Sequence, residues 1–275
     1  ELFLSLPNDG NNLHLSANMC AEHRTEVLKE IRIRLKQRKD GDTRPLRVVS
    51  TQLIEAGVDV DFPVVYRAMA GLDSIAQAAG RCNREGLMRE KGRLVVFWRT
   101  SMAPPGFLRQ GEQTTLSLLK GGLLDDPFSP ESMTRYFSEL NRQGSRDKYD
   151  ICGILKAEQT RDVPLGIAFR TAADKFKLID NAGIAIIVPF SSVSAEESPV
   201  FMWLNMLEKD PSAKWVYRKL QRYTVTVPES FARQLDSANV LESLAGQFVV
   251  KEAYYHDVWG VQPPDTLLTV EQTVF

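Results

Sequence analysis

Cysteine is scarce in this sequence. Its 275 residues include three cysteines, Cys20, Cys82 and Cys152, and no two of them have the Cys-x-x-Cys spacing. A disulfide framework or a structural zinc site is therefore not expected, and a cytoplasmic location fits the composition. Long apolar runs are also lacking, since the longest, around residues 182–190, is far too short to span a bilayer. No signal peptide opens the chain, and we expect no membrane partner.

Neither sign of charge is in excess. Hydrophobic residues make up 43% of the chain and charged residues 25%, a balance typical of soluble globular proteins. The formal net charge of -1 neither favours nor excludes a nucleic-acid partner, so any such contact must come from a local patch or from backbone amides. The length suits two domains of ordinary size. Because the chain opens with Glu1 rather than Met and carries the motifs described below, we interpret it as a fragment of a longer protein.

The first hundred residues alternate short apolar strands with helices. We expect helices at residues 21–39 and 72–79, with Asp73 or Ser74 capping the second. The expected strands lie at residues 13–19, 46–50, 64–67 and 93–99. The order strand, helix, strand, strand, helix, strand is typical of an α/β lobe with a parallel sheet.

The remainder of the chain has a different character. Residues 103–130 are punctuated by proline and glycine, and we interpret them as a linker with a short helix near residues 114–119. From residue 131 we expect a smaller α+β accessory domain, which gives predicted domains at 1–102, 103–130 and 131–275. Its expected helices lie at residues 131–141, 199–208 and 212–222, and its strands at 184–189, 223–227 and 248–251.

Several large apolar residues of this accessory domain are expected to form its core. They are Trp203, Leu204, Leu207, Trp215, Leu220 and Tyr223. The aromatic residues Tyr254, Tyr255 and Trp259 have two interpretations. They suit stacking on nucleic-acid bases, but core packing is the favoured one.

Three polar side chains recur at a helical spacing. Gln77, Arg81 and Arg84 are four and three residues apart, so a continuous helix would place them on one face, and Gly80 between them permits close approach. Stacked arginines repel each other, which predicts an anion between them, and guanidinium groups suit phosphate oxygens. A transferring γ-phosphoryl group is a natural ligand, and an arginine at such a group accelerates transfer by about 10³–10⁵-fold. A solvated basic face is the alternative.

A second polar segment follows the strand expected at residues 46–50. In open α/β sheets, ligands bind where the strands end. The hydroxyl and N–H groups of Ser50 and Thr51 at this position suit a phosphodiester backbone. The alternative is a plain helix cap. A tight turn is expected at residues 55–59.

Taken together, these two segments resemble a known family. STQLIEAGVDVDF at residues 50–62 and QAAGRCNREG at residues 77–86 resemble motifs V and VI of superfamily 2 helicases, most closely those of the CRISPR-associated helicase-nucleases of type I interference systems. The strand that contains Ser16, followed by His23 and Arg24, resembles the family's motif IV, and residues 220–225 resemble its C-terminal domain. The resemblance covers most of the chain and implies a second RecA-like lobe followed by an accessory domain.

The resemblance also implies roles for individual residues. Gln77, Arg81 and Arg84 would face ATP phosphates across a cleft to a first lobe, with the two arginines as arginine fingers. Gly57 and Asp59 would lie near the nucleotide ribose. Contacts to the single-stranded DNA backbone, which carry no sequence information, would come from Ser16, Asn18, Ser50, Thr51 and Gln52.

Parts that such a motor requires are missing from the sequence. It has no GxxxxGK[ST] phosphate loop and no Asp-Glu pair of a Walker B motif. We therefore expect a first lobe outside this chain to bind ATP and to supply most of the ligands of its Mg²⁺ ion. We expect this chain alone to be inactive. With three histidines in the sequence, the metal ions of an HD nuclease domain are also expected outside it. His256 and Asp257 are interpreted as a surface or strand-end pair and Cys82 as a small buried filler.

The implied whole protein is an ATP-dependent single-stranded DNA translocase and nuclease that an RNA-guided surveillance complex recruits. Two alternatives remain open at this point. One is a different superfamily 2 helicase. The other is a non-catalytic C-terminal module that binds DNA or a protein.

Overall fold

The chain forms two compact units in the computed structural model. One comprises Glu1–Val58 with Asn181–Phe275, the other comprises Asp59–Asp180, and each is described by itself. The structure describes residues 2–54, 58–86, 91–142, 147, 149–157, 167–176, 183–191 and 197–264. These units divide the chain differently from the domains predicted at 1–102, 103–130 and 131–275, and the predicted boundaries stay a prediction.

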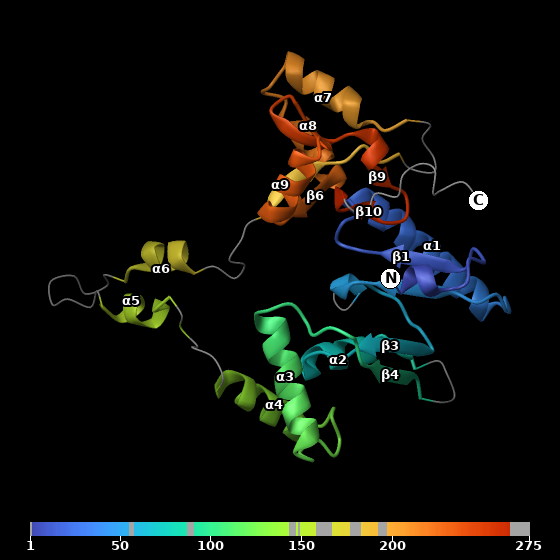
Figure 1. The fold of residues 1–275 in the computed structure, drawn as a ribbon, viewed down its shortest axis with the longest axis vertical. Helices are drawn as coiled ribbons and strands as arrows, with labels where there is room; N and C mark the ends of the chain where they lie inside the picture. Colours follow the sequence, from blue (N-terminus) through green and yellow to red (C-terminus); the bar gives the residue numbers. More distant parts are fainter. Residues whose placement is uncertain are drawn as a thin grey trace. The chain divides into compact units, whose positions relative to one another are not determined.

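A parallel strand pair opens the first unit (Figure 1). β1 (Asn12–Leu15) and β2 (Arg47–Ser50) pair in parallel, with Leu15 opposite Ser50 at their C-terminal ends. Parallel neighbours need a crossover connection, and α1 (Ala21–Lys39) supplies it, with the bounds that the sequence predicts. The helix ends before Gly41, whose φ of +107° suits glycine and few other residues.

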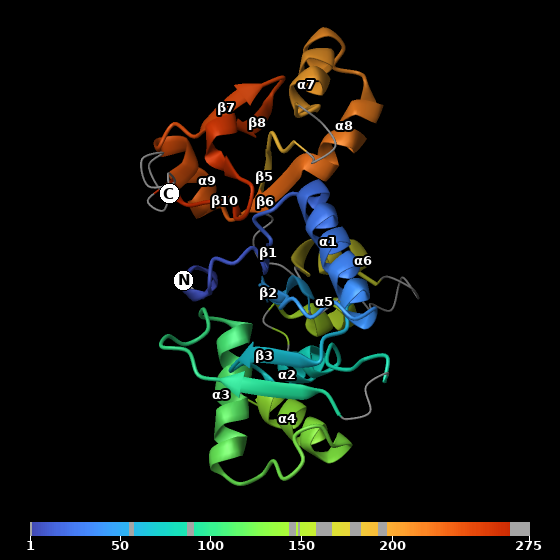
Figure 2. The same cartoon turned by 90° about the vertical axis from the view of Figure 1, so that its right-hand side faces the viewer.

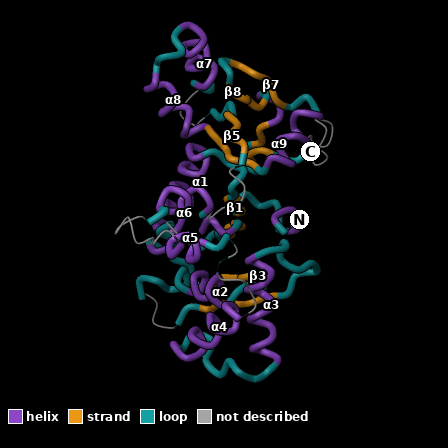
Figure 3. The backbone as a smooth tube through the Cα atoms, turned by 90° about the vertical axis from the view of Figure 1, so that its left-hand side faces the viewer, coloured by secondary structure: helices purple, strands orange, loops and turns teal. Residues whose placement is uncertain are grey.

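A four-stranded sheet forms the main core of the first unit. The strand order is β6 (Thr224–Val227), β5 (Ile184–Ile187), β8 (Gln247–Val250) and β7 (Leu241–Leu244). β5 runs antiparallel to β6 and parallel to β8. In Figures 2 and 3, α7 (Val200–Lys209) and α8 (Lys214–Leu220) lie on one side of the sheet and α9 (Glu229–Ser237) on the other. Ile186 and Ile187 are both buried, as this two-sided cover requires.

A short strand pair near the C-terminus packs against the start of the chain. β9 (Tyr255–His256) and β10 (Gly260–Val261) pair in antiparallel fashion. The Val261 N–H donates to the Asn18 carbonyl at 2.9 Å, and the Cys20 N–H donates to the Tyr255 hydroxyl at 3.2 Å. The Trp259 ring packs 4.9 Å from Phe3. Core packing, the favoured interpretation, is confirmed for Tyr255, which is buried, and for Tyr254, which packs against the core, whereas Trp259 is half-buried.

The second unit contains the other parallel pair, β3 (Val64–Ala68) with β4 (Arg93–Phe97). With β1–β2, this pair confirms the expected α/β class with parallel strands. Helices α2 (Leu72–Ala79), α3 (Phe107–Lys120) and α4 (Pro130–Arg142) share a small core of Leu72, Leu118, Tyr136 and Leu140. The unit also includes α5 (Ile151–Ala157) and α6 (Phe169–Lys175). Helix α3 is longer than the short linker helix predicted at residues 114–119.

The start of α2 differs from the sequence-based expectation. The bounds of α2 are as predicted, but its N-cap is Gly71 and no side chain caps it, so the expected cap by Asp73 or Ser74 is wrong. Asp73 instead accepts a 2.8 Å hydrogen bond from the Tyr136 hydroxyl. A Cβ atom on Gly71 would lie 2.5 Å from this hydroxyl oxygen, so glycine is needed for the close approach of the two chain segments.

Short 3-10 turns complete the described elements. They are η1 (Phe3–Ser5), η2 (Gln52–Ile54), η3 (Gln221–Tyr223) and η4 (Glu252–Tyr254). Among the predicted accessory-domain core residues, Leu204, Leu207, Leu220 and Tyr223 are buried and Trp203 packs against them. The prediction for Trp215 is wrong, because 52% of its surface is exposed.

Candidate functional site

The C-terminal ends of β1 and β2 present polar groups at one edge of the first unit. Ser50 is half-buried at the end of β2, and Thr51 and Gln52 after it are exposed. The Thr51 N–H donates to the Leu15 carbonyl at 3.1 Å, which continues the pairing of the two strands. The Ser50 hydroxyl donates to the Thr51 carbonyl at 2.8 Å, a local turn contact rather than a helix cap. The accessible groups at this edge suit a phosphate backbone.

Ser16 and Asn18 lie in the loop after β1, where the C-terminal strand pair covers them. Ser16 is 5% exposed, and its hydroxyl lies 3.5 Å from the Trp259 carbonyl and accepts the Asn18 N–H at 3.3 Å. Gly260 packs closely here, since a Cβ atom on it would lie 2.5 Å from the Asn18 carbonyl carbon. Sequence reasoning missed this cover, because Ser16 and Trp259 are 243 positions apart.

The segment with the predicted arginine fingers does not form one helical face. α2 ends at Ala79 with Gly80 as its C-cap, so the expected helical stacking of Gln77, Arg81 and Arg84 is wrong. Gln77 is exposed on the last turn of α2, while Arg81 and Arg84 follow the helix. Glycine disfavours continuation of a helix, which accounts for the end at this position.

After the helix, the chain pairs with the segment that precedes β3. The Phe62 N–H donates to the Arg81 carbonyl at 3.0 Å, and the Asn83 N–H donates to the Phe62 carbonyl at 3.1 Å. Asn83 has a φ of +49°, which turns the chain sharply before Arg84. This pairing brings the two predicted motifs together by backbone contact rather than along a helix.

Two aspartates hold Arg84. Its Nη1 donates to Asp59 Oδ1 at 2.9 Å, and its backbone N–H donates to Asp61 Oδ1 at 2.7 Å. The Glu85 N–H makes a longer bond of 3.4 Å to Asp61 Oδ2. The side chains of Arg84 and Asp59 are 45% and 78% exposed, so this ion pair contributes little to stability, about 0–1 kcal/mol. Its effect is to orient an exposed guanidinium group.

The structure brings some predicted residues together and leaves others apart. Asp59 and Arg84 meet in an ion pair of the second unit, Arg81 joins the same stretch through its backbone carbonyl on the Phe62 N–H, and Gln77 lies on the last turn of α2. Gly57 lies outside the described residues. Asp61 was missed, and the signal that points to it is the second aspartate two positions after Asp59.

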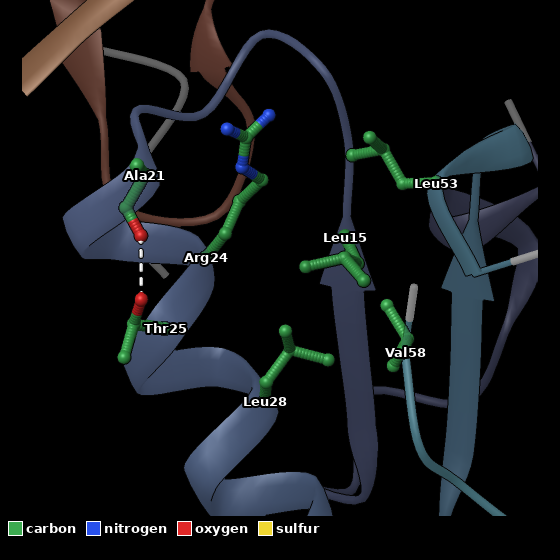
Figure 4. Close-up of a pocket in the computed structure, with 7 residues that line it drawn as sticks. All are labelled: Leu15, Ala21, Arg24, Thr25, Leu28, Leu53 and Val58. Atoms are coloured by element: carbon green, nitrogen blue, oxygen red, sulfur yellow. Dashed lines mark hydrogen bonds between the residues drawn. The ribbon is translucent and has the colours of Figure 1, made fainter. Parts of the chain in front are cut away.

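A largely apolar pocket of about 300 Å³ lies in the first unit (Figure 4). Its lining includes Leu15, Leu28, Leu53 and Val58, and Arg24 brings a guanidinium group above the aliphatic side chains. None of the described lining residues is a predicted site residue, but Leu15 directly precedes Ser16 and Leu53 directly follows Gln52.

Cys82 lies between Arg81 and Arg84 in the sequence, and its contacts are those of a packed side chain. Its Sγ is 3.4 Å from the Pro63 carbonyl, and burial raises the pKa of its thiol. A raised pKa lowers the thiolate fraction, which supports the interpretation as a filler. The His256 Nδ1 accepts the Val258 N–H at 3.0 Å, a local turn contact.

The described ranges hold neither a metal-binding cluster nor a membrane-spanning helix. No three His, Cys, Asp or Glu side chains gather in them as a metal site would require, and the expectation that nuclease metals are held outside this chain stays a prediction. None of the helices described is both long and apolar enough to cross a bilayer.

Comparison with known proteins connects these observations to a family. Residues 3–87 match the family described as CRISPR-associated nuclease/helicase Cas3, C-terminal. The Cas3 nuclease/helicase of Haloferax volcanii is 46% identical over 74 residues, which cover 27% of this chain and 8% of that protein. The Cas3 of Methanothermobacter thermautotrophicus is 23% identical over 278 residues, covering 90% of this chain and 32% of the relative.

Solved structures give a further comparison. The T. fusca Cas3–ADP crystal structure has a TM-score of 0.49 and 18% identity, covering 85% of this chain and 31% of that one. The chain thus spans a third or less of the length of each of these relatives.

Proposed function

We propose that the chain supplies the arginine fingers of an ATP-driven DNA motor, because residues 3–87 match the family described as CRISPR-associated nuclease/helicase Cas3, C-terminal. The whole protein would translocate along single-stranded DNA and degrade foreign DNA in CRISPR interference. This chain would provide the second RecA-like lobe and the accessory domain. A first lobe and a nuclease domain outside the chain would complete it.

The observation that carries the proposal is the presentation of Arg84. Arg84 has Asp59 on its side chain and Asp61 on its backbone N–H, so two different acids of the preceding segment contact one arginine. These contacts keep the exposed guanidinium in one region of the unit. A γ-phosphoryl group brought by the first lobe would then replace Asp59 as the partner of Arg84. Guanidinium groups bind phosphate through two parallel hydrogen bonds, which suits this exchange.

Neighbouring residues would contact the same ATP phosphates as Arg84. Arg81 would act as the second finger, and Gln77 would contact the same phosphates from the end of α2. Asp59, which the family resemblance assigns to the ribose region with Gly57, would also position Arg84 before ATP arrives. ATP and Mg²⁺ would be held mainly by the first lobe, so this chain alone would not hydrolyse ATP.

The DNA track would run along the exposed edge after β2. Thr51 and Gln52 are accessible there and Ser50 is half-accessible, which supports contact with DNA phosphates. Ser16 and Asn18 would join them only after the segment around Trp259 moves, because that segment covers Ser16. Recruitment by an RNA-guided surveillance complex and a cytoplasmic location remain part of the proposal through the family resemblance.

The proposal is tested by replacing Arg84 in the full-length protein. Arg84→Ala should lower DNA-stimulated ATP hydrolysis by about 10³-fold or more, with single-stranded DNA binding retained. Arg84→Lys should restore little of the rate, since an ammonium group lacks the planar fork. Arg233→Ala is the matched control, because Arg233 is also an exposed arginine in a surface ion pair with an acid, Glu229.

Two results would contradict the assignment. Near-normal turnover of Arg84→Ala would show that Arg84 takes no part in ATP hydrolysis. An equal loss in Arg233→Ala would attribute the effect to a general disturbance of the protein. If the full-length protein bound DNA but had no ATPase activity at all, the non-catalytic DNA-binding alternative would replace the motor.

A further inference from the structure

Helix α8 exposes aromatic and basic side chains on the first unit. Val216 and Leu220 face the core, and the side chains between and before them are exposed. We refer to these exposed residues as the α8 surface; they are Lys214, Trp215, Tyr217, Arg218 and Lys219. Trp215 is 52% exposed and Tyr217 is 37% exposed. The two rings therefore present apolar faces to solvent, on a helix whose Val216 and Leu220 are buried.

The exposed tryptophan shares a lysine with a second ring that packs on the core. Lys219 Nζ lies 5.3 Å from the centre of the Trp215 ring and 5.4 Å from the centre of the Trp203 ring. Trp203 packs against the core of the unit, and its ring lies edge-on to Tyr223 at 5.4 Å. These contacts connect Trp215 to the core through a cation between two rings. An aromatic platform with a fixed orientation loses less entropy when a ligand stacks on it.

The charge of the α8 surface indicates what kind of ligand it suits. Residues 214–222 include Lys214, Arg218, Lys219 and Arg222 and no acidic residue, in a chain whose net charge is -1. Arg222 pairs with Glu22 at 2.5 Å. Lys214, Arg218 and Lys219 make no ion pair in the part of the chain that the structure describes. A local excess of unpaired cations beside an exposed ring matches a polyanion that also carries flat, apolar groups.

We propose that the α8 surface binds single-stranded DNA, with a base stacked on the Trp215 ring and with Lys214, Arg218 and Lys219 beside the flanking phosphates. A duplex is a poor fit, because its bases stack on one another and leave no free face for Trp215. A protein partner would use the same aromatic and arginine side chains, and an unchanged Kd for Trp215→Ala is the result that would indicate it. This inference rests on the proposed function, since it adds a DNA contact to the same motor.

The test is a binding measurement on the 275-residue chain with a labelled oligothymidylate of about 20 nucleotides, followed by fluorescence anisotropy. Trp215→Ala should raise the Kd about 5- to 150-fold, which is the usual effect of losing one base-stacking ring. Trp215→Phe should retain most of the affinity, because it keeps a ring. Trp98→Ala is the matched control and should leave the Kd unchanged, since Trp98 is another exposed tryptophan, at 67%.

Lys219→Gln provides a second, milder variant. It should weaken binding and reduce the slope of log K against log salt by about 0.7, the value for one lost contact to a single strand. A duplex of the same length should bind Trp215→Ala and the unaltered chain equally well. Circular dichroism on each variant verifies that the fold is retained.

Three results would overturn the inference. An unchanged Kd for Trp215→Ala would leave the α8 surface as a protein-docking surface instead. Equal losses on duplex and single-stranded DNA would exclude base stacking, and absence of binding by the unaltered chain would exclude the site. Each of these failures is distinguishable from failure of the motor, because the motor is judged by the ATPase activity of Arg84→Ala in the full-length protein.

Discussion

Asp61 offers a sharp test of how Arg84 is presented, because it contacts the backbone of the arginine rather than its side chain. Asp61 Oδ1 accepts the Arg84 N–H at 2.7 Å, and Oδ2 accepts the Glu85 N–H at 3.4 Å. Asp61→Ala removes both acceptors while leaving the guanidinium group and its partner Asp59 in the sequence. We expect this change to impair ATP hydrolysis through position alone.

The size of the effect follows from these two bonds. The first is short and charge-assisted, and the second is too long to count for much. One partly exposed bond of this kind contributes about 1–2 kcal/mol, so the fraction of molecules with Arg84 in place should fall about 5- to 30-fold. Asp61→Ala should therefore lower kcat by roughly tenfold, well short of the loss of about 10³-fold or more expected for Arg84→Ala.

The assay is DNA-stimulated phosphate release by the full-length protein at varied ATP concentration. A positioning role predicts a fall in kcat that Asp61→Asn partly reverses, since the amide oxygen still accepts one N–H. Asp126→Ala is the control, because Asp126 also accepts a backbone N–H in an exposed turn, from Phe128 at 3.0 Å. A normal kcat in Asp61→Ala would refute the reasoning, as would a loss as large as that of Arg84→Ala.

Other predictions concern stability and thiol reactivity. Gly71→Ala should lower the free energy of unfolding by about 1–3 kcal/mol, measured with urea, because its Cβ would meet the Tyr136 hydroxyl oxygen at 2.5 Å; an unchanged midpoint would contradict the close packing. Tyr136→Phe should cost about 1–3 kcal/mol through the lost bond to Asp73, whereas Tyr66→Phe, at a residue 68% exposed, should be neutral. Under native conditions a thiol reagent should label exposed Cys152 well before Cys20, since Cys20 is buried and burial raises the pKa of its thiol; equal rates would contradict the described packing.

The sequence predicts local elements better than long-range contacts. The bounds of α1 and α2 match the prediction because glycine lies just after each helix and apolar residues repeat within it. The end of α2 at Ala79 also shows the limit of spacing arguments. Gln77, Arg81 and Arg84 have a helical spacing, but Gly80 and the pairing with Phe62 end the helix between them. The motif was recognisable, but its geometry was not.

The cover over Ser16 and the exposure of Trp215 illustrate the same limit. A hydroxyl at the end of a strand is accessible only if nothing packs on it, and Trp259 comes from the far end of the chain. Trp215 is followed by Val216 and Tyr217 in the sequence, and a large apolar side chain there suggests a core position. Its helix places Val216 and Leu220 inward instead, and Lys219 holds the ring at the surface. Neither outcome follows from local pattern, because both depend on which element packs against which.

The central claim is that Arg84 meets the γ-phosphate of ATP bound by the first lobe. A structure of the full-length protein with single-stranded DNA and ADP–aluminium fluoride, a mimic of the transferring phosphoryl group, measures this contact directly. We predict that Arg84 leaves Asp59 and that its guanidinium nitrogens lie about 3 Å from the fluoride atoms. A guanidinium group that stays on Asp59, with no arginine of this chain near the mimic, would contradict the account.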